Sequence, residues 1–224
     1  MPATEEKPSR YLSGIILAAG ASTRIGRPKQ LLPLGSRTVL QCVLDEAVAS
    51  GLDEVILVLG DRADAVLSAV KLPSERRVRV VVNADFARGQ STSLRLGLRS
   101  ADDRSAGAAV LLGDQPGVTA GLIDEVANAF RTAGLPAARP VYEGADGRRV
   151  PGHPVLLARR IWPEVELLEG DEGARALLSA HPGWLLEIPV EGEAPGDIDT
   201  REDYESAVHD AKPRPQSPAG LEGH

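Results

Sequence analysis

Two positively charged side chains follow a short apolar run near the start of the chain. Residues 14–16 (GII) lead directly into residues 17–29 (LAAGASTRIGRPK). An apolar run that stops at small residues and glycine is typical of a buried strand entering a loop. In such a loop backbone N–H groups can approach anionic oxygens, while Arg24 offers a planar fork of donors and Lys29 a compact charge. The stretch therefore predicts a triphosphate-binding loop. Its spacing matches neither the Walker A pattern nor the Rossmann glycine fingerprint, which disfavours a P-loop ATPase and a dinucleotide dehydrogenase.

An acidic side chain closes a second apolar run, in residues 111–116 (LLGDQP). Asp114 at the end of a buried strand is costly to desolvate unless it has a cation or hydrogen-bond donors beside it. Magnesium is a natural partner, because it favours one or two carboxylates together with substrate phosphates. The alternative is an Asp that starts a turn, helped by Pro116.

A second carboxylate for such a site is available in residues 197–204 (DIDTREDY). Asp197 and Asp199 are the candidates. The alternative is ordinary helix capping, because Thr200 or Asp199 precedes acids in the first turn of an expected helix. Capping and metal binding can share this segment.

Polar side chains also open the helix expected after residues 78–82, in residues 88–95 (RGQSTSLR). Gly89 permits close approach, and Gln90, Ser91 and Ser93 offer directional hydrogen bonds suited to a base edge or ribose hydroxyls. A simple Ser/Thr helix cap is the alternative, although it leaves the glycine and glutamine unexplained.

Strand-like and helix-like segments alternate through the chain and must position these groups. Short runs rich in Val, Ile and Leu predict buried strands at 15–18, 54–59, 78–82 and 108–112. Amphipathic spacing predicts helices at 39–50, 63–70 and 122–133. The fold class is therefore α/β, a three-layer, Rossmann-like, doubly wound and mostly parallel sheet. Ligands of such sheets bind beyond the carboxyl ends of the strands, where the first two motifs fall.

Composition and length set further limits. The chain has 224 residues, 42% of them hydrophobic, and a net charge of -7, which favours one domain and argues against nucleic acid as a partner. Cys42 is the single cysteine, so neither an intrachain disulfide nor a cysteine-ligated zinc site is expected. A polar start and the lack of long apolar runs predict a cytoplasmic protein without a membrane span. We expect a flexible N-terminus at 1–12, one domain at 13–209 and a disordered, Pro/Gly-rich tail at 210–224.

The residues beyond Pro140 change in character. Residues 139–142 and 147–155 predict an edge hairpin that reaches over the sheet. Residues 170–175 (GDEGAR) predict a helix start whose N–H groups, with Arg175, could hold an acceptor phosphate. His153 is interpreted as lining the acceptor site, although a lone histidine near a strand start is more often structural.

In their order these motifs resemble the MobA/MocA-like nucleotidyltransferases, over about residues 13–208. The resemblance implies a nucleotide-diphospho-sugar transferase type of fold, with a nucleotide half at about 13–135 and an acceptor half at about 136–209. It also implies a magnesium-dependent reaction with release of pyrophosphate. The form of residues 18–20 (AAG) resembles the members that transfer CMP from CTP to the phosphate of molybdopterin.

The resemblance also assigns roles to residues. The implied nucleotide-binding set is Leu17, Ala18, Ala19, Gly20, Arg24, Lys29, Gln90, Ser91, Ser93 and Asp114. Asp114 and Asp199 are the implied magnesium ligands, with Asp197 in reserve. Lys29 is expected near the α-phosphate, Arg24 at the leaving pyrophosphate, and His153 and Arg175 on the acceptor side. An acceptor phosphate is already ionised near neutral pH, so no general base is required.

Three other functions stay open. A guanylyltransferase would use GTP in place of CTP. A related enzyme would use another acceptor, such as a sugar phosphate, an isoprenoid precursor or a phospholactate. A non-catalytic module would deliver cofactor to a molybdenum enzyme, and turnover would distinguish it from the enzymes.

Overall fold

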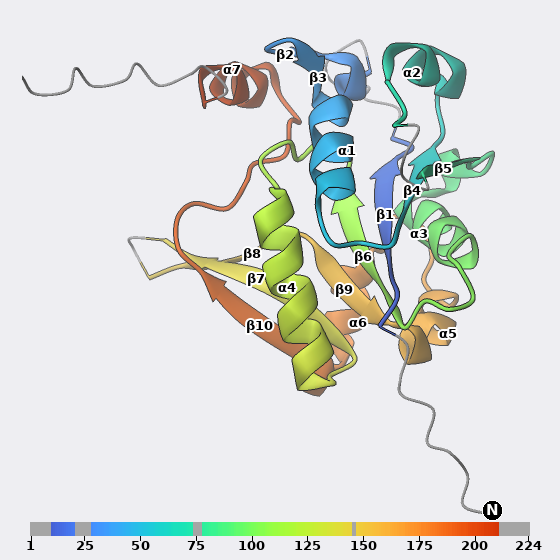
Figure 1. Cartoon of the computed structure of the whole chain (residues 1–224), viewed down its shortest axis with the longest axis vertical. Coiled ribbons are helices and arrows are strands. Elements are labelled where there is room, and N and C mark those ends of the chain that lie inside the picture. The colour runs from blue at the N-terminus through green and yellow to red at the C-terminus, as the bar shows by residue number, and fades with distance from the viewer. Residues whose placement is uncertain (1–9, 21–27, 74–77, 145–146, 211–224) are drawn as a thin grey trace, which may run out of the picture.

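The computed structural model describes residues 10–20, 28–73, 78–144 and 147–210. Its centre is an eight-stranded sheet with the order β10-β7-β9-β6-β1-β4-β5, in which β8 pairs with β7 (Figure 1). The strands are β1 (Leu12–Ala18), β4 (Glu54–Leu59), β5 (Val78–Val82), β6 (Gly107–Leu112), β7 (Ala137–Glu143), β8 (Arg149–Pro151), β9 (Val155–Ala158) and β10 (Leu185–Val190). A separate two-stranded hairpin is formed by β2 (Pro33–Leu34) and β3 (Arg37–Thr38).

Most neighbouring strands of the sheet are parallel. β1 pairs in parallel with β4 on one side and β6 on the other, and β4 and β5 are also parallel. The antiparallel pairings are those of β9 with β6 and β7 and that of β8 with β7. The parallel pairings place the carboxyl ends of β1, β4 and β6 at one edge of the sheet, where the predicted motifs begin.

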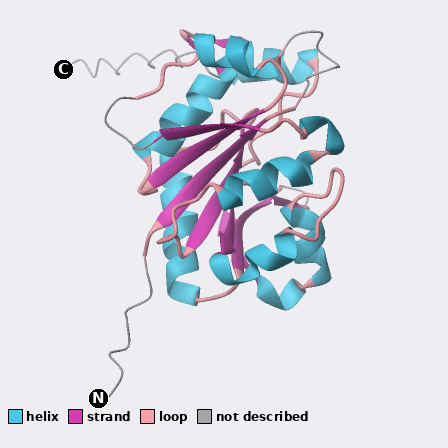
Figure 2. Ribbon diagram, turned by 90° about the vertical axis from the view of Figure 1, so that its right-hand side faces the viewer, coloured by secondary structure: helices cyan, strands magenta, loops and turns pink. Residues whose placement is uncertain are grey.

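Helices cover both faces of the sheet (Figures 1 and 2). The α-helices are α1 (Val39–Ala49), α2 (Ala63–Ala69), α3 (Gln90–Arg99), α4 (Ala120–Ala133), α5 (Trp162–Val165), α6 (Ala174–Ala180) and α7 (Arg201–Asp210). Short 3-10 helices are η1 (Lys29–Leu31), η2 (Phe86–Arg88), η3 (Arg159–Ile161) and η4 (Pro182–Trp184). One hydrophobic cluster joins the sheet to α1, α2 and α4, and a second joins it to α3, α5 and α6.

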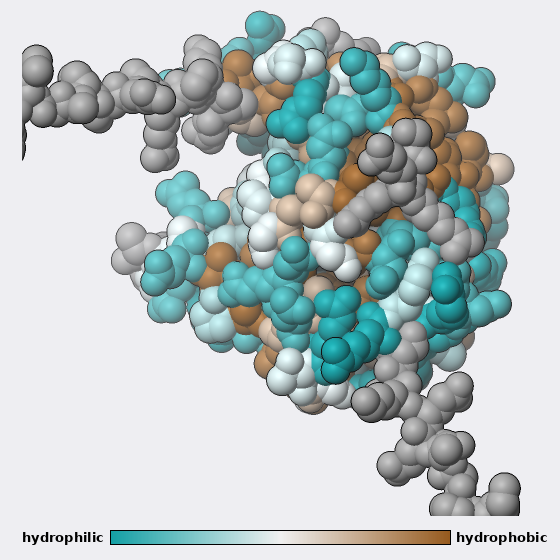
Figure 3. All heavy atoms as spheres, viewed as in Figure 1, coloured by the Kyte–Doolittle hydropathy of each residue, from teal (hydrophilic) through white to brown (hydrophobic). Residues whose placement is uncertain are grey.

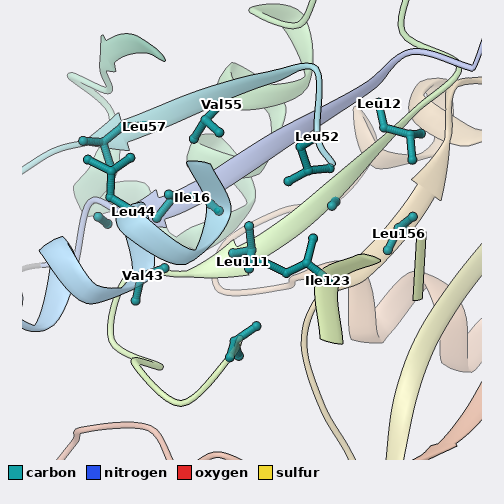
Figure 4. Packing of buried hydrophobic residues seen from close by; sticks show 14 of the residues in the cluster. Leu12, Ile16, Val43, Leu44, Leu52, Val55, Leu57, Leu111, Ile123 and Leu156 are labelled. Atoms are coloured by element: carbon teal, nitrogen blue, oxygen red, sulfur yellow. The ribbon is translucent and has the colours of Figure 1, made fainter. Parts of the chain in front are cut away.

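The alternation of side chains along the central strands produces these two clusters. In β1, Ile16 packs in the first cluster and Ile15 in the second, and both are fully buried. Successive side chains of a strand point to opposite faces, so an apolar run without alternation requires a cover on each face. Figure 4 shows the first cluster, in which Ile16 and Leu111 lie between the sheet and the helices. The predicted three-layer, doubly wound, mostly parallel fold is confirmed.

The helix ends follow local chemistry. Thr38 and Thr119 cap α1 and α4, each accepting a hydrogen bond of 3.2 Å from the backbone N–H of Gln41 and Leu122. Gly134 ends α4 with a φ of 64°, which favours glycine. The solvent side of α4 is hydrophilic, as the lower middle of Figure 3 shows. No helix in the described ranges is long and apolar enough to span a membrane.

The sequence predicts the first half of the sheet well and the second half less well. The strands at 54–59 and 78–82 have the predicted bounds, and β1 and β6 begin three residues and one residue earlier than predicted. The predicted position of the hairpin at 139–155, at the edge of the sheet, is wrong for its first strand. β7 and β8 do form a hairpin, but β7 lies inside the sheet, because β10 pairs with one side of it and β9 with the other. The predicted N-terminal and C-terminal tails lie almost entirely outside the described residues, and α7 extends to Asp210.

A third hydrophobic cluster connects the C-terminal segment to the β2–β3 hairpin. Ile198 is 1% exposed and packs with Leu32, Val39 and Cys42. Tyr204 of α7 adds a hydrogen bond of 2.6 Å from its hydroxyl to the carbonyl oxygen of Pro33. These contacts fix the residues around Ile198 at the same end of the molecule as the carboxyl ends of β1 and β6 (Figure 1).

Candidate active site

The loop after β1 is held from inside the protein by Gln30. This side chain is 3% exposed, and its amide donates hydrogen bonds of 3.2 Å to the carbonyl oxygen of Ala18 and 3.3 Å to that of Gly20. The described start of the loop, up to Gly20, is therefore fixed at the end of β1. Sequence reasoning missed Gln30, although its position beside Lys29 was a signal. Arg24 lies outside the described residues, so its predicted role stays a prediction.

Asp114 follows β6 at the same edge of the sheet. Gly113 donates its backbone N–H to the carbonyl oxygen of Leu17 at 2.9 Å, which joins the ends of β6 and β1. The backbone oxygen of Asp114 in turn accepts a hydrogen bond of 3.2 Å from the N–H of Ile198. The end of β6 thus connects the first loop to the segment before α7.

Lys29 lies between two carboxylates that are far apart in the sequence. Its ammonium forms ion pairs with Asp114 and, at 2.9 Å, with Asp199. Burial acts to lower the pKa of Lys29, but the two carboxylates raise it more, so the net shift is upward from 10.5. The ammonium is therefore charged at neutral pH. The structure brings together the three residues that the sequence analysis assigns to phosphate and metal binding.

Asp197 lies in the same region and is in a different environment. Burial raises its pKa, and the nearby negative charges of Asp114 and Asp199 add to this shift. A hydrogen bond from the side-chain amide of Gln115 and the charge of Lys29 act in the opposite direction. The carboxylate of Asp197 is thus held by a neutral amide, whereas that of Asp199 pairs with an ammonium.

The capping interpretation of residues 197–204 is also correct. Thr200 and Asp203 cap α7 reciprocally, because the N–H of Asp203 donates to the hydroxyl of Thr200 at 3.1 Å and the N–H of Thr200 to the carboxylate of Asp203 at 2.7 Å. The carboxylate of Asp199 is free of this capping role and points to Lys29. Capping and a site role therefore coexist in one segment.

The start of α3 presents a second set of polar groups. Gln90 is exposed, and Asn83 donates its side-chain amide to the hydroxyls of Thr92 at 2.8 Å and Ser93 at 2.9 Å. Ser91 is fully buried, and its hydroxyl has no hydrogen-bond partner within the described ranges. The two predicted serine hydroxyls therefore differ in position. Ser93 lines a pocket, whereas Ser91 is buried in the interior.

One pocket of about 380 Å³ joins these elements. Its volume lies within the range of small-molecule sites. Of the predicted nucleotide-binding residues it contains Leu17, Ala18, Ala19, Gly20, Lys29, Gln90, Ser93 and Asp114. It also contains Gly89, which the sequence analysis associates with close approach, and residues without a predicted role, namely Gln30, Phe86, Ala87, Leu112, Gly113 and Asp171. A larger cavity of about 850 Å³ beside α7 has neither Lys29 nor Asp114 in its lining.

The pocket extends along the sheet edge and differs in charge from end to end. Its lining combines Asp114 after β6, the residues at the end of β1, and the start of α3 with Asp171. Lys29 supplies positive charge beside Asp114, whereas Asp171 adds a carboxylate beside Gln90.

Neither of the two predicted acceptor residues lines this pocket. His153, between β8 and β9, has a buried Nδ1 without a hydrogen-bond partner in the described part of the chain. Burial lowers the pKa of His153 to about 4, and the charge of Asp114 opposes this only in part, so the imidazole is neutral at pH 7. Arg175 is exposed on α6 and does not line the pocket. The loop before α6 brings Asp171 to the pocket instead.

The donor set suits a hard divalent cation. Asp114 and Asp199 already converge on one cationic group, and a third carboxylate, Asp197, lies close enough to interact with both. Within the described residues, no group of three or more His, Cys, Asp or Glu side chains is arranged to hold a metal by itself. Magnesium in proteins is commonly coordinated by one or two carboxylates together with oxygens of the substrate phosphates.

Known proteins resemble the chain over most of its length. The model of the MobA-like NTP transferase domain matches residues 14–184. Nicotine blue oxidoreductase of Paenarthrobacter nicotinovorans is 34% identical over 197 residues, which cover 85% of this chain and 93% of that protein. The molybdenum cofactor cytidylyltransferase of Escherichia coli (strain K12) is 26% identical over 193 residues, which cover 86% of this chain and 93% of that enzyme.

A solved structure agrees in fold. Rv0371C of Mycobacterium tuberculosis H37Rv, crystallised as a complex with manganese, has a TM-score of 0.73 and 34% identity and covers 89% of this chain and 98% of its own. A divalent cation thus binds to a similar protein. From the family match over most of the chain and from the shared fold, we conclude that this protein belongs to the family of MobA-like NTP transferase domains.

Proposed function

We propose that this nucleotidyltransferase transfers CMP from CTP to the phosphate of molybdopterin and releases pyrophosphate. The observation that carries the proposal is the convergence of Lys29, Asp114 and Asp199 at one end of the pocket. Transfer brings an anionic acceptor to an anionic donor, so the barrier is largely electrostatic and geometric. A fixed ammonium with two carboxylates at the end of a nucleotide-sized pocket meets this requirement.

The positions of the side chains support the following assignment of roles. A phosphate oxygen of the acceptor forms the new bond to the α-phosphorus, and the bond from that phosphorus to the bridging oxygen of pyrophosphate breaks. Lys29 stays protonated and stabilises the charge that accumulates at the α-phosphate. The backbone after β1 approaches the leaving phosphates. No proton has to leave the acceptor, so His153 acts as a neutral hydrogen-bonding group on the acceptor side.

Asp114 and Asp199 are the residues that would hold a magnesium ion. When bound, the ion supplies charge neutralisation for the phosphate oxygens. Rv0371C binds manganese, which supports a divalent cation here as well. Asp197 is assigned a supporting position, because its carboxylate is held by the amide of Gln115 and not by the ammonium.

The choice of CTP and molybdopterin rests on the relatives and on the small residues after β1. The E. coli relative is a molybdenum cofactor cytidylyltransferase. Ala19 is 6% exposed and contributes to the pocket lining, and its methyl group lies near Gly60. A methyl group or one hydrogen bond contributes about 1–3 kcal/mol, so we expect preference for CTP over GTP of about tenfold to two-hundredfold.

The experiment incubates the purified full chain with molybdopterin, MgCl₂ or MnCl₂, and one nucleoside triphosphate at a time. We expect pyrophosphate release with CTP, a dinucleotide product on chromatography, and loss of both in Asp114→Asn. Preference for GTP would refute the cytidylyltransferase assignment and leave the nucleotidyltransferase assignment standing. Nucleotide binding without any transfer would favour a cofactor-delivery module.

A redox activity is the second candidate, because a relative that aligns with 85% of the chain is named an oxidoreductase. The discriminating assay supplies the same protein with NADH or NADPH and a reducible dye, without any nucleoside triphosphate. We expect no turnover above that of boiled protein. Sustained turnover would favour the oxidoreductase assignment.

A further inference from the structure

Asp171 is the carboxylate at the end of the pocket away from Lys29. It belongs to the segment between α5 and α6, and it lines the pocket together with Phe86 and Gln90. Its Oδ1 accepts a hydrogen bond of 3.4 Å from the backbone N–H of Gln90, a long bond that leaves acceptor capacity on an exposed carboxylate. The site described above does not use this group.

The position of Asp171 is set by backbone packing. The N–H of Ser91 donates to the carbonyl oxygen of Gly170 at 3.0 Å. Gly89 has a φ of 111°, and a Cβ atom on it would lie 2.1 Å from the carbonyl carbon of Gly170. The segment before α6 therefore rests directly on the start of α3, and only glycine permits this approach. The neighbouring residue, Asp171, is held at the pocket as a result.

The charge of Asp171 determines which part of a nucleotide can lie beside it. A carboxylate accepts hydrogen bonds and donates none, and it repels phosphate oxygens. The phosphates therefore belong at the Lys29 end, and the nucleobase at the end formed by Phe86, Gln90 and Asp171. A base with an exocyclic amine offers a donor to this carboxylate, whereas a carbonyl oxygen in the same place would face it with a second acceptor.

We propose that Asp171 is a specificity residue that selects cytosine over uracil by accepting a hydrogen bond from the exocyclic amine. Cytosine presents this amine at the position where uracil presents a carbonyl oxygen, and Asp or Glu is a suitable acceptor for the cytosine amine. The inference deepens the proposed function and rests on it for the presence of a nucleotide in the pocket.

The test is equilibrium binding of CTP and UTP to the full chain in the presence of MnCl₂ and without an acceptor. For the wild type we expect CTP to bind at least about tenfold more tightly than UTP. Asp171→Asn offers an amide donor to the uracil carbonyl, so the ratio is expected to fall to about one or below. Asp171→Glu keeps the carboxylate and is expected to retain the preference for CTP.

Glu169→Gln is the matched control, since it removes a negative charge from an exposed residue of the same segment that does not line the pocket. We expect it to leave the ratio unchanged, and thermal unfolding verifies that all variants fold. An unchanged ratio in Asp171→Asn, an equal change in Glu169→Gln, or a wild type that does not prefer CTP over UTP would overturn the inference.

The transfer assay distinguishes failure of this inference from failure of the proposed function. Transfer with an unaltered ratio in Asp171→Asn refutes only the role of Asp171, and the expected ratios without any transfer refute only the proposed reaction.

Discussion

Single side chains at the edge of the sheet have distinct electrostatic environments. Lys29 is charged because its carboxylate partners outweigh burial, and His153 is neutral because burial lowers its pKa. The pKa of Asp197 is raised by partial desolvation and by the neighbouring acids. Each shift is a difference in free energy between the charged and uncharged forms. The three residues are therefore expected to respond differently to substitution and to pH.

The carboxylates before α7 and after β6 are expected to differ in their effect on activity. Asp114→Asn and Asp199→Asn should each lower the rate of transfer at saturating MgCl₂ by about 100-fold, because each removes a charge from the end of the pocket where phosphates are proposed to react. Asp197→Asn should lower it by a smaller factor, since Asp197 is held by Gln115. Steady-state kinetics of the three variants measures this, with thermal unfolding as the check on folding. A larger loss for Asp197→Asn would move the proposed ligand by two residues.

The pKa of His153 has a consequence for stability. Because the folded-state pKa of about 4 lies below the ordinary value of 6.5, the unfolded chain binds more protons between these values. The free energy of unfolding therefore falls as the pH falls through this window, by about 2 kcal/mol from pH 7 to pH 5 on account of this residue. Urea unfolding at both pH values should show a smaller loss for His153→Gln than for the wild type.

The control for this experiment is His209→Gln on the exposed side of α7. We expect it to lose stability with falling pH as the wild type does. The same flattening in both variants would contradict the assignment of this pH dependence to burial of His153.

At the scale of elements, the contact between Gly89 and Gly170 joins α3 to the segment before α6. Gly89→Ala should destabilise the fold by more than about 2 kcal/mol and weaken CTP binding, since it adds both a backbone clash and an unfavourable φ. Gly134→Ala at the end of α4 is the matched control, because its φ of 64° is also positive and a Cβ there would meet nothing within 4 Å. It should cost about 1–2 kcal/mol and leave CTP binding unchanged. Urea unfolding and equilibrium binding measure both effects, and equal effects of the two substitutions would refute a special contact at Gly89.

At the scale of the whole molecule, negatively charged side chains are concentrated at one end of the sheet. Asp114, Asp197 and Asp199 lie near one another, and among the described residues Lys29 pairs with two of them. A divalent cation that binds only to the folded state should raise the melting temperature, by about 3–6 °C at ten times its Kd for a chain of this size. Calorimetry with MnCl₂ measures this against NaCl at equal ionic strength. The increase should be lost in Asp114→Asn, and an equal increase in that variant would place the cation elsewhere.

Local sequence patterns determined the first half of the fold. The strands at 54–59 and 78–82 have the predicted bounds, and α1 and α4 coincide closely with the helices predicted at 39–50 and 122–133. Apolar runs and amphipathic spacing predict them because these signals act over a few neighbouring residues. Sequence signals of the same local kind also identified the loop after β1 and Asp114 at the end of β6. The parallel fold then placed both at one edge, since the carboxyl ends of parallel strands lie together.

The tertiary structure alone decided the contacts between distant segments. β9 inserts between β6 and β7, and β10 covers the other side of β7, so the first strand of the predicted edge hairpin lies inside the sheet, whereas β8 pairs with β7 alone. Lys29 meets Asp199 across 170 positions of sequence because Ile198 and Tyr204 pack against the β2–β3 hairpin. Gln30, Gln115 and Asp171 entered the site only with the structure, and Arg175 stayed outside the pocket. Such contacts depend on the packing of whole elements, and packing is a property of the complete fold that residue spacing along the chain does not encode.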